Sequence, residues 1–140
     1  MSDFIVDNSV VMAWAFADED EEYPVDVLKN LENSTALVPA IWLLELTNVL
    51  AVAERRSCLT ESESLRFLTL LSELPIEVVQ DSKDINTARQ LLFIARDFNL
   101  SAYDASYLDL AIERNLPLAT LDSKLRCAAK KAGIAIWRHQ

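Results

Sequence analysis

Short β-prone runs alternate along this sequence with longer segments of helical periodicity. A strand, a helix and a second strand in succession need a crossover connection, which is nearly always right-handed and gives a mainly parallel sheet. The alternation therefore predicts an α/β fold. Strands are expected at residues 4–6, 36–38, 76–79, 117–122 and 134–136, and helices at 10–16, 24–31, 39–56, 60–74, 82–97, 101–115 and 123–132.

Length and composition favour one compact domain over residues 1–140. Hydrophobic residues make up 51% of the chain, enough for a core, and four prolines with one glycine leave no linker or repeat. Apolar runs fall short of the ~20 residues of a membrane span, and no signal peptide is visible, so we expect a cytosolic protein. Cys58 and Cys127 stand alone, which favours reduced packing thiols over a disulfide or a zinc site.

Charge is distributed unevenly along the chain. The formal net charge of −9 argues against unaided binding to a polyanion. Residues 1–45 hold ten acids, including a run at 18–22 that we expect to be a surface loop, against Lys29 alone. Residues 123–140 hold no acid and five basic side chains, so this end of the chain can contact phosphates; they are Lys124, Arg126, Lys130, Lys131 and Arg138.

One acid lies inside the most apolar predicted helix. Residues 39–56 are apolar on nearly every face, which is typical of a helix buried all round, yet Glu45 stands in the second turn. An unpaired buried carboxylate costs on the order of several kcal/mol, so a cation, a trapped proton or a basic partner would have to compensate it. Asn48 lies on nearly the same face. The alternative is that Glu45 borders a crevice with its carboxylate in water.

Two further acids each follow a predicted strand. Asp7 comes after residues 4–6, and Asp122 ends the run at 117–122. Aspartate at such a position is a favourable helix N-cap. It also stands at the carboxyl edge of the sheet, where open α/β sheets bind ligands. For each residue both interpretations are open.

The helix at 101–115 carries two more acids. Ser101 and Asp104 match a capping pattern, so Asp104 has a structural explanation of its own. Asp109 lies roughly 140° further round the helix and is not expected to share a target with Asp104. Thr60 and Glu63 form a second capping pattern, at the start of the helix at 60–74.

Convergence of Asp7, Glu45 and Asp122 at one edge of a parallel sheet is the simplest account of their positions. Clustered carboxylates suit a hard divalent cation, and ligation by oxygen alone favours Mg²⁺ or Mn²⁺ over zinc. Such ions activate water for hydrolysis of phosphodiesters. The only histidine, His139, and the only glycine, Gly133, leave two-histidine ribonucleases, Ser-His-Asp hydrolases and Gly-rich phosphate loops unsupported.

Four motifs in order resemble the PIN domain, and most closely the VapC-type toxins of prokaryotic toxin–antitoxin pairs. They are I-V-D-N-S at 5–9, E-L-T-N at 45–48, Y-D-A-S-Y-L-D-L-A at 103–111 and A-T-L-D-S-K-L at 119–125. The resemblance implies a three-layer α/β/α fold around about five short strands. It implies four metal-binding, catalytic acids (Asp7, Glu45, Asp104 and Asp122) and three supporting polar residues (Ser9, Asn48 and Thr120).

The same resemblance implies a metal-dependent endoribonuclease that is neutralised by a cognate antitoxin and forms a homodimer. Two divalent cations at the four acids would add four charges and bring the net charge from −9 to about −5. The basic segment after Asp122 is then a candidate RNA contact through Lys124, Arg126, Lys130 and Lys131.

Three other functions fit parts of the sequence. An aspartyl phosphatase with Asp7 as nucleophile would need a second acid at position 9, which is serine. A phospho-accepting receiver domain would need an acceptor after the third strand, where Asp81 is a loose match. An inert PIN-like scaffold is disfavoured because all four acids are present.

Overall fold

Four short parallel strands form the central sheet of the described residues, in the order β3-β2-β1-β4. The computed structural model describes residues 3–16, 21–80 and 83–138. The strands are β1 (Phe4–Val6), β2 (Ala36–Pro39), β3 (Ile76–Val79) and β4 (Leu118–Ala119). Because the strands are all parallel, their carboxyl ends meet at one edge, as the alternation predicts.

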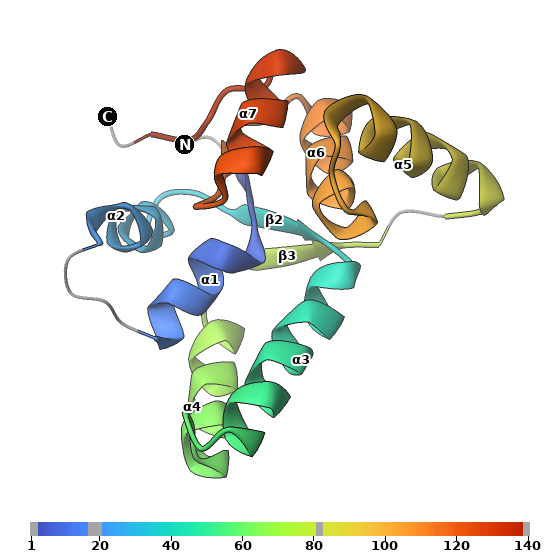
Figure 1. Cartoon of the computed structure of the whole chain (residues 1–140). Helices are drawn as coiled ribbons and strands as arrows, with labels where there is room; N and C mark the ends of the chain where they lie inside the picture. The colour runs from blue at the N-terminus through green and yellow to red at the C-terminus, as the bar shows by residue number, and fades with distance from the viewer. Residues whose placement is uncertain (1–2, 17–20, 81–82, 139–140) are drawn as a thin grey trace.

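Helices cover both faces of this sheet, which gives the predicted three layers (Figure 1). In Figure 1, α5, α6 and α7 lie above the sheet, whereas α1, α3 and α4 lie below it. The helices are α1 (Asn8–Ala15), α2 (Glu22–Asn30), α3 (Ile41–Arg55), α4 (Glu61–Ser72), α5 (Ile85–Phe98), α6 (Ala102–Arg114) and α7 (Ser123–Lys131). Within the described residues, no helix is long and apolar enough to cross a membrane.

The last two predicted strands are shorter than expected. The run at 117–122 pairs only at Leu118 and Ala119, because the next backbone amides bond to side chains: Leu121 N to Ser9 Oγ and Asp122 N to Thr120 Oγ1. The predicted strand at 134–136 is reduced to a single parallel bridge between Ile136 and Leu118. The expectation of about five strands is corrected to four strands and one bridge.

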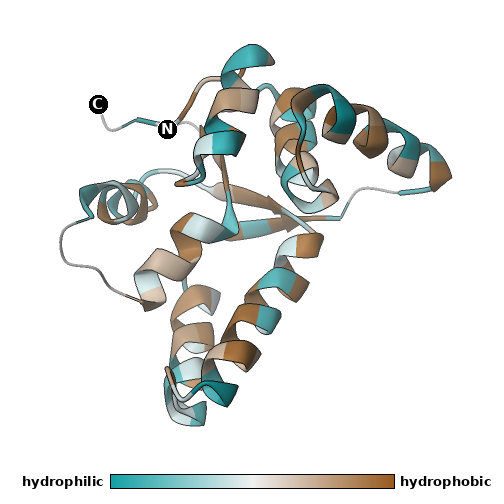
Figure 2. Cartoon of the chain, viewed as in Figure 1, coloured by the Kyte–Doolittle hydropathy of each residue, from teal (hydrophilic) through white to brown (hydrophobic). Residues whose placement is uncertain are grey.

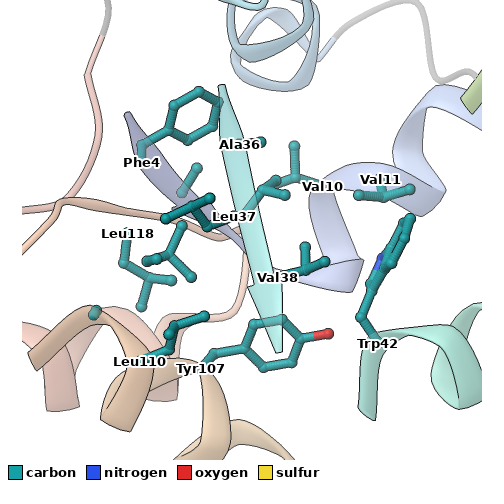
Figure 3. Close-up of a cluster of buried hydrophobic side chains, with 14 of the residues drawn as sticks. Phe4, Val10, Val11, Ala36, Leu37, Val38, Trp42, Tyr107, Leu110 and Leu118 are labelled. Carbon is teal, nitrogen blue, oxygen red and sulfur yellow. The ribbon is translucent and has the colours of Figure 1, made fainter. Parts of the chain in front are cut away.

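The core lies between β1 and the helices on either side of it. All three residues of β1 are fully buried, and Val38 of β2 and Leu118 of β4 are buried beside them. Figure 3 shows Phe4, Val38 and Leu118 in this cluster with the ring of Tyr107, whose oxygen points toward the side on which Trp42 of α3 lies. Full burial of a large apolar side chain contributes roughly 1.5–3 kcal/mol to the free energy of folding. This core therefore holds the strands, and with them the carboxyl edge of the sheet, in a fixed position.

Helix α3 is not buried all round, which corrects the prediction from its composition. Its buried residues, Trp42, Leu46, Leu50 and Ala53, follow a spacing of three or four and form one stripe. Leu44 is 68% exposed and Leu43 is also exposed. Figure 2 shows hydrophobic colour along much of this helix, so hydropathy alone does not identify the covered face. Neighbouring elements cover one side of α3 only.

Capping determines several helix boundaries. The predicted capping box of α4 is confirmed, since Glu63 N donates to Thr60 Oγ1 and Thr60 N donates to Glu63 Oε1. Helix α5 begins at Ile85 because Asp84 caps it. The expected start at 82 and most of the acidic run at 18–22 lie outside the described residues, and Glu22 already belongs to α2.

Candidate active site

Asp7 lies at the carboxyl end of β1 and is only 5% exposed. It occupies the N-cap position of α1, but its side chain makes no capping hydrogen bond. Instead, Asp7 Oδ2 accepts hydrogen bonds from Ser9 Oγ at 2.8 Å and from Thr120 Oγ1 at 2.7 Å. Ser9 and Thr120, two of the supporting residues that the resemblance implies, therefore hold the carboxylate of Asp7 in place.

The donor and acceptor roles of the Ser9 and Thr120 hydroxyl groups follow from their other hydrogen bonds. Leu121 N donates to Ser9 Oγ at 3.1 Å, and Asp122 N donates to Thr120 Oγ1 at 3.0 Å. Because each hydroxyl has one proton and accepts from a backbone amide, its proton is available for Asp7. Burial raises the pKa of Asp7, the hydroxyl hydrogen bonds oppose this, and the charge of Asp122 adds to the rise.

Glu45 projects from the second turn of α3 and is half-buried. Its Oε1 accepts a 2.7 Å hydrogen bond from the hydroxyl of Tyr107, a fully buried residue of α6. Burial raises the pKa of Glu45; the tyrosine bond lowers it, and the charges of Asp7 and Asp104 raise it again. The crevice-edge interpretation thus describes Glu45 better than complete burial.

Sequence reasoning missed Tyr107 as a functional residue. A buried tyrosine in an apolar helix is typical of a core position, and its ring is indeed core. The available signal was its spacing, since Tyr107 follows Asp104 by three residues and a hydroxyl on that face can reach a neighbouring acid. Burial and the adjacent Glu45 raise the pKa of Tyr107 strongly, so its hydroxyl stays protonated and acts as a donor.

Asp104 lies in the first turn of α6 and is half-buried. The cap of this helix is Ser101, whose Oγ accepts from Asp104 N at 3.1 Å. The capping pattern is therefore confirmed. Burial raises the pKa of Asp104, the charges of Asp7 and Asp122 raise it further, and a side-chain hydrogen bond with Ser101 lowers it.

Asp122 is the N-cap of α7, as one of the two open interpretations stated. Its Oδ1 accepts from Lys124 N at 3.4 Å. The same carboxylate also raises the pKa of both Asp7 and Asp104. Asp122 thus caps a helix and faces the other acids.

The four acids lie at one sheet edge and interact electrostatically. The charges of Asp7 and Asp104 raise the pKa of Glu45, the charge of Asp7 raises that of Asp104, and the charge of Asp122 raises those of Asp7 and Asp104. In the part of the chain that is described, no group of three or more acids, histidines or cysteines lies close enough together to hold a metal ion without movement of side chains or bridging water. Mg²⁺ keeps several waters and takes one or two carboxylates directly, so this spread all-oxygen donor set fits a hydrated Mg²⁺ or Mn²⁺.

The remaining predicted residues have varied surroundings. Asn48 is exposed and lines a hollow beside Glu45. Asp109 is buried and accepts a 3.0 Å hydrogen bond from Gln90 of α5, so it faces away from the other acids, as expected. Cys58 and Cys127 are free, as expected, but both are exposed, which corrects their assignment as packing thiols.

The basic residues of α7 divide into two kinds. Lys124, Lys130 and Lys131 are exposed, and Lys124 lowers the pKa of Asp104. Arg126 is half-buried: its Nε donates to Thr120 O at 2.7 Å, and its guanidinium lies 4.6 Å from the ring centre of Tyr23. Arg126 therefore holds the segment that carries Thr120, whereas the three lysines extend into solvent.

Comparisons with known proteins give the family of this sequence and structures with a similar fold. The family model of the PIN domain matches residues 4–131, and the chain belongs to that family. PIN domains are generally nucleases that use divalent metal ions. No protein with curated annotation matches the sequence.

Several solved structures have a similar fold. PAE2754 from Pyrobaculum aerophilum is 24% identical with a TM-score of 0.67, over 91% of this chain and 86% of that one. VapBC2 from Rickettsia felis, bound to a DNA fragment from its promoter, is 12% identical with a TM-score of 0.66, over 96% and 97%. A toxin–antitoxin complex from Klebsiella pneumoniae is 19% identical with a TM-score of 0.62, over 88% and 89%. At these identities the likeness concerns the fold.

Proposed function

We propose that this chain is a metal-dependent endoribonuclease acting as one domain over residues 1–140, and that it is the toxin of a type II toxin–antitoxin pair in the cytosol. The observation that carries the proposal is the position of Asp7, Glu45, Asp104 and Asp122 at one sheet edge, where hydroxyl groups hold the carboxylates of Asp7 and Glu45. Like charges held together without a counter-charge repel, and a divalent cation supplies that charge.

In this proposal the four acids hold Mg²⁺ or Mn²⁺. When bound there, such an ion would supply activation of water and charge neutralisation at a phosphodiester. Ser9 and Thr120 donate to Asp7 Oδ2, and Tyr107 donates to Glu45 Oε1. These neutral donors orient the carboxylates without removing their charge.

The exposed lysines of α7 are proposed to contact the RNA backbone. Lys124 lies beside Asp122 at the start of the helix, and Lys130 and Lys131 lie in its last turn. Lys124 would thus give a phosphate bound near Asp104 a positive charge, which the four acids cannot provide.

Product chemistry tests the proposed reaction. The purified chain should cleave RNA in Mn²⁺ and leave 5′-phosphate and 3′-hydroxyl ends, because an activated water attacks rather than the ribose 2′-hydroxyl. Activity that persists in EDTA, or 2′,3′-cyclic phosphate ends, would contradict the mechanism. Asp104→Asn is the inactive reference, and its circular dichroism should match that of the wild type.

An antitoxin and a second copy of the chain are the proposed protein partners. The fold likeness to the Klebsiella pneumoniae toxin–antitoxin complex supports the first. A hollow of about 810 Å³ between α1 and α4 has none of the four acids in its lining; Leu65, Phe67 and Leu70 give it apolar surface for an antitoxin segment. The test of both partners is co-expression with any small open reading frame that neighbours this gene, followed by light scattering of the product and of the free chain.

A further inference from the structure

A second hollow, of about 430 Å³, lies directly beside Glu45. Its walls come from α3, from Asn8 at the start of α1 and from Tyr103 in the first turn of α6. Glu45 lines this hollow, so a group that fills it contacts one of the four acids. On the function proposed above, that group is the part of the RNA next to the cleaved bond.

The walls of this hollow are apolar on one side. Tyr103 is 57% exposed although it adjoins Asp104, and Leu44 on the facing helix is 68% exposed. Ile41 and Val49 extend the apolar surface along α3. An exposed aromatic ring opposite aliphatic side chains suits a flat, uncharged group, and an unpaired nucleobase stacks on such a ring whatever its identity.

Two amides supply polar contacts in the same hollow. Asn48 is exposed and offers both a donor and an acceptor, the combination that reads the edge of a base. Asn8 is only 7% exposed, and its Oδ1 is a buried acceptor that receives no hydrogen bond from any described residue. Buried acceptors are nearly always paired, so this wall has hydrogen-bonding capacity that the protein leaves unused.

We propose that this hollow binds one unpaired nucleobase adjacent to the scissile phosphodiester, with Tyr103 stacking on the base and Asn48 bonding to its edge. The volume is at the lower end of small-molecule sites and suits one nucleotide rather than a duplex. The substrate is therefore RNA that is single-stranded, or has a base turned outward, at the point of cleavage. Base preference is determined at this nucleotide.

Fluorescence of 2-aminopurine tests the stacking directly. The probes are short single-stranded RNAs with 2-aminopurine at successive positions, bound in Ca²⁺ without Mg²⁺ or Mn²⁺. Wild type should quench the emission at one position. Tyr103→Ala should abolish the quench and bind roughly five- to a hundredfold more weakly, which is the effect of removing one stacked base.

Three further variants separate stacking from a general effect on the fold. Tyr103→Phe keeps the ring and should behave as wild type, whereas Tyr103→Leu keeps apolar bulk without a ring and should behave as Tyr103→Ala. Phe93→Ala removes an aromatic side chain of almost the same exposure, 58%, on α5 outside the hollow, and should quench normally. Asn48→Ala should retain the quench and flatten the preference among the four natural bases.

The outcomes separate this inference from the proposed ribonuclease activity. Quenching that depends on Tyr103 without any cleavage in Mn²⁺ would retain the base site and overturn the nuclease. Cleavage in Mn²⁺ that is equally efficient in wild type and Tyr103→Ala, with unchanged 2-aminopurine emission, would retain the nuclease and overturn the base site.

Discussion

The hydroxyl of Tyr107 donates a 2.7 Å hydrogen bond to Glu45 Oε1, joining α6 to α3 across 62 positions of sequence. The tyrosine is fully buried and the glutamate is half-buried, so the donor is rigid and the acceptor is held at the edge of water. The bond fixes one oxygen of Glu45, whose pKa the charges of Asp7 and Asp104 raise. Its removal should therefore affect catalysis more than folding.

Tyr107→Phe should reduce kcat/KM roughly ten- to a hundredfold, because a hydrogen bond to a charged group contributes about 1.5–3 kcal/mol. The ring remains in the core, so the melting temperature should change little. Thr47→Val is the control, since it removes a hydroxyl of α3 that donates to the backbone oxygen of Leu43 rather than to an acid. Equal kinetic effects of the two variants would exclude a positioning role for Tyr107.

The hydroxyl of Thr120 should matter for stability and for metal affinity. Thr120→Val keeps the shape but leaves Asp122 N without its acceptor and Asp7 with one donor fewer, at a cost of about 1–3 kcal/mol. Denaturant unfolding and Mn²⁺ titration measure the two effects, and Thr120→Ser should restore both. Thr69→Val, at an exposed hydroxyl on α4, is the control and should change neither.

Much of this edge could be predicted from local sequence. Asp7 and Asp122 follow strands, and parallel strands bring their carboxyl ends together, so their proximity follows from the alternation. Asp104 required the family resemblance, because its spacing is equally well explained by a helix cap. For Tyr107 the only signal was its spacing from Asp104, and that spacing does not say whether the hydroxyl meets an acid or only completes the core.

Tertiary contacts explain the remaining differences. The exposed side of α3 depends on which elements pack against it, and its uniformly apolar sequence does not indicate which side that is. The shortened β4 has a similar cause, since the amides of Leu121 and Asp122 bond to hydroxyls rather than to a neighbouring strand. Arg126 looked like its neighbouring lysines in sequence, yet packs against Tyr23.

The lysines of α7 and Arg126 should respond differently to mutation. Replacing Lys124, Lys130 and Lys131 together by Gln should weaken RNA binding and reduce the slope of log affinity against log salt by roughly 0.7 for each phosphate that these lysines neutralise. Arg126→Gln should instead lower the melting temperature, because it releases Thr120 O and the ring of Tyr23. An unchanged slope in the triple variant would place the RNA elsewhere, such as along Arg55 and Arg56.

Stability of the metal-free chain should fall as pH rises through the range in which the acids ionise. The folded-state pKa values of Asp7, Glu45 and Asp104 all lie above their usual values of 3.8 for Asp and 4.5 for Glu. At pH values between the usual pKa and the raised folded-state pKa, the folded state binds more protons than the unfolded state. The stability that this provides is complete below about pH 4 and is lost as pH rises through the folded-state pKa values. Asp104→Asn should reduce this loss, as measured by unfolding in EDTA from about pH 3.5 upward. Identical pH profiles for wild type and variant would contradict the coupling.

Thermal unfolding with and without Mn²⁺ tests most directly whether the four acids form one metal centre. A cation bound only by the folded state stabilises it by about 2.7 kcal/mol at a hundredfold excess over Kd, and each kcal/mol raises the melting temperature of such a chain by roughly 2–4 °C or more. Asp104→Asn should melt above wild type in EDTA, because one repelling charge is gone, and should lose much of the Mn²⁺-dependent rise. A variant that melts below wild type in EDTA and still gains the full Mn²⁺ shift would show that Asp7, Glu45, Asp104 and Asp122 do not act as one site.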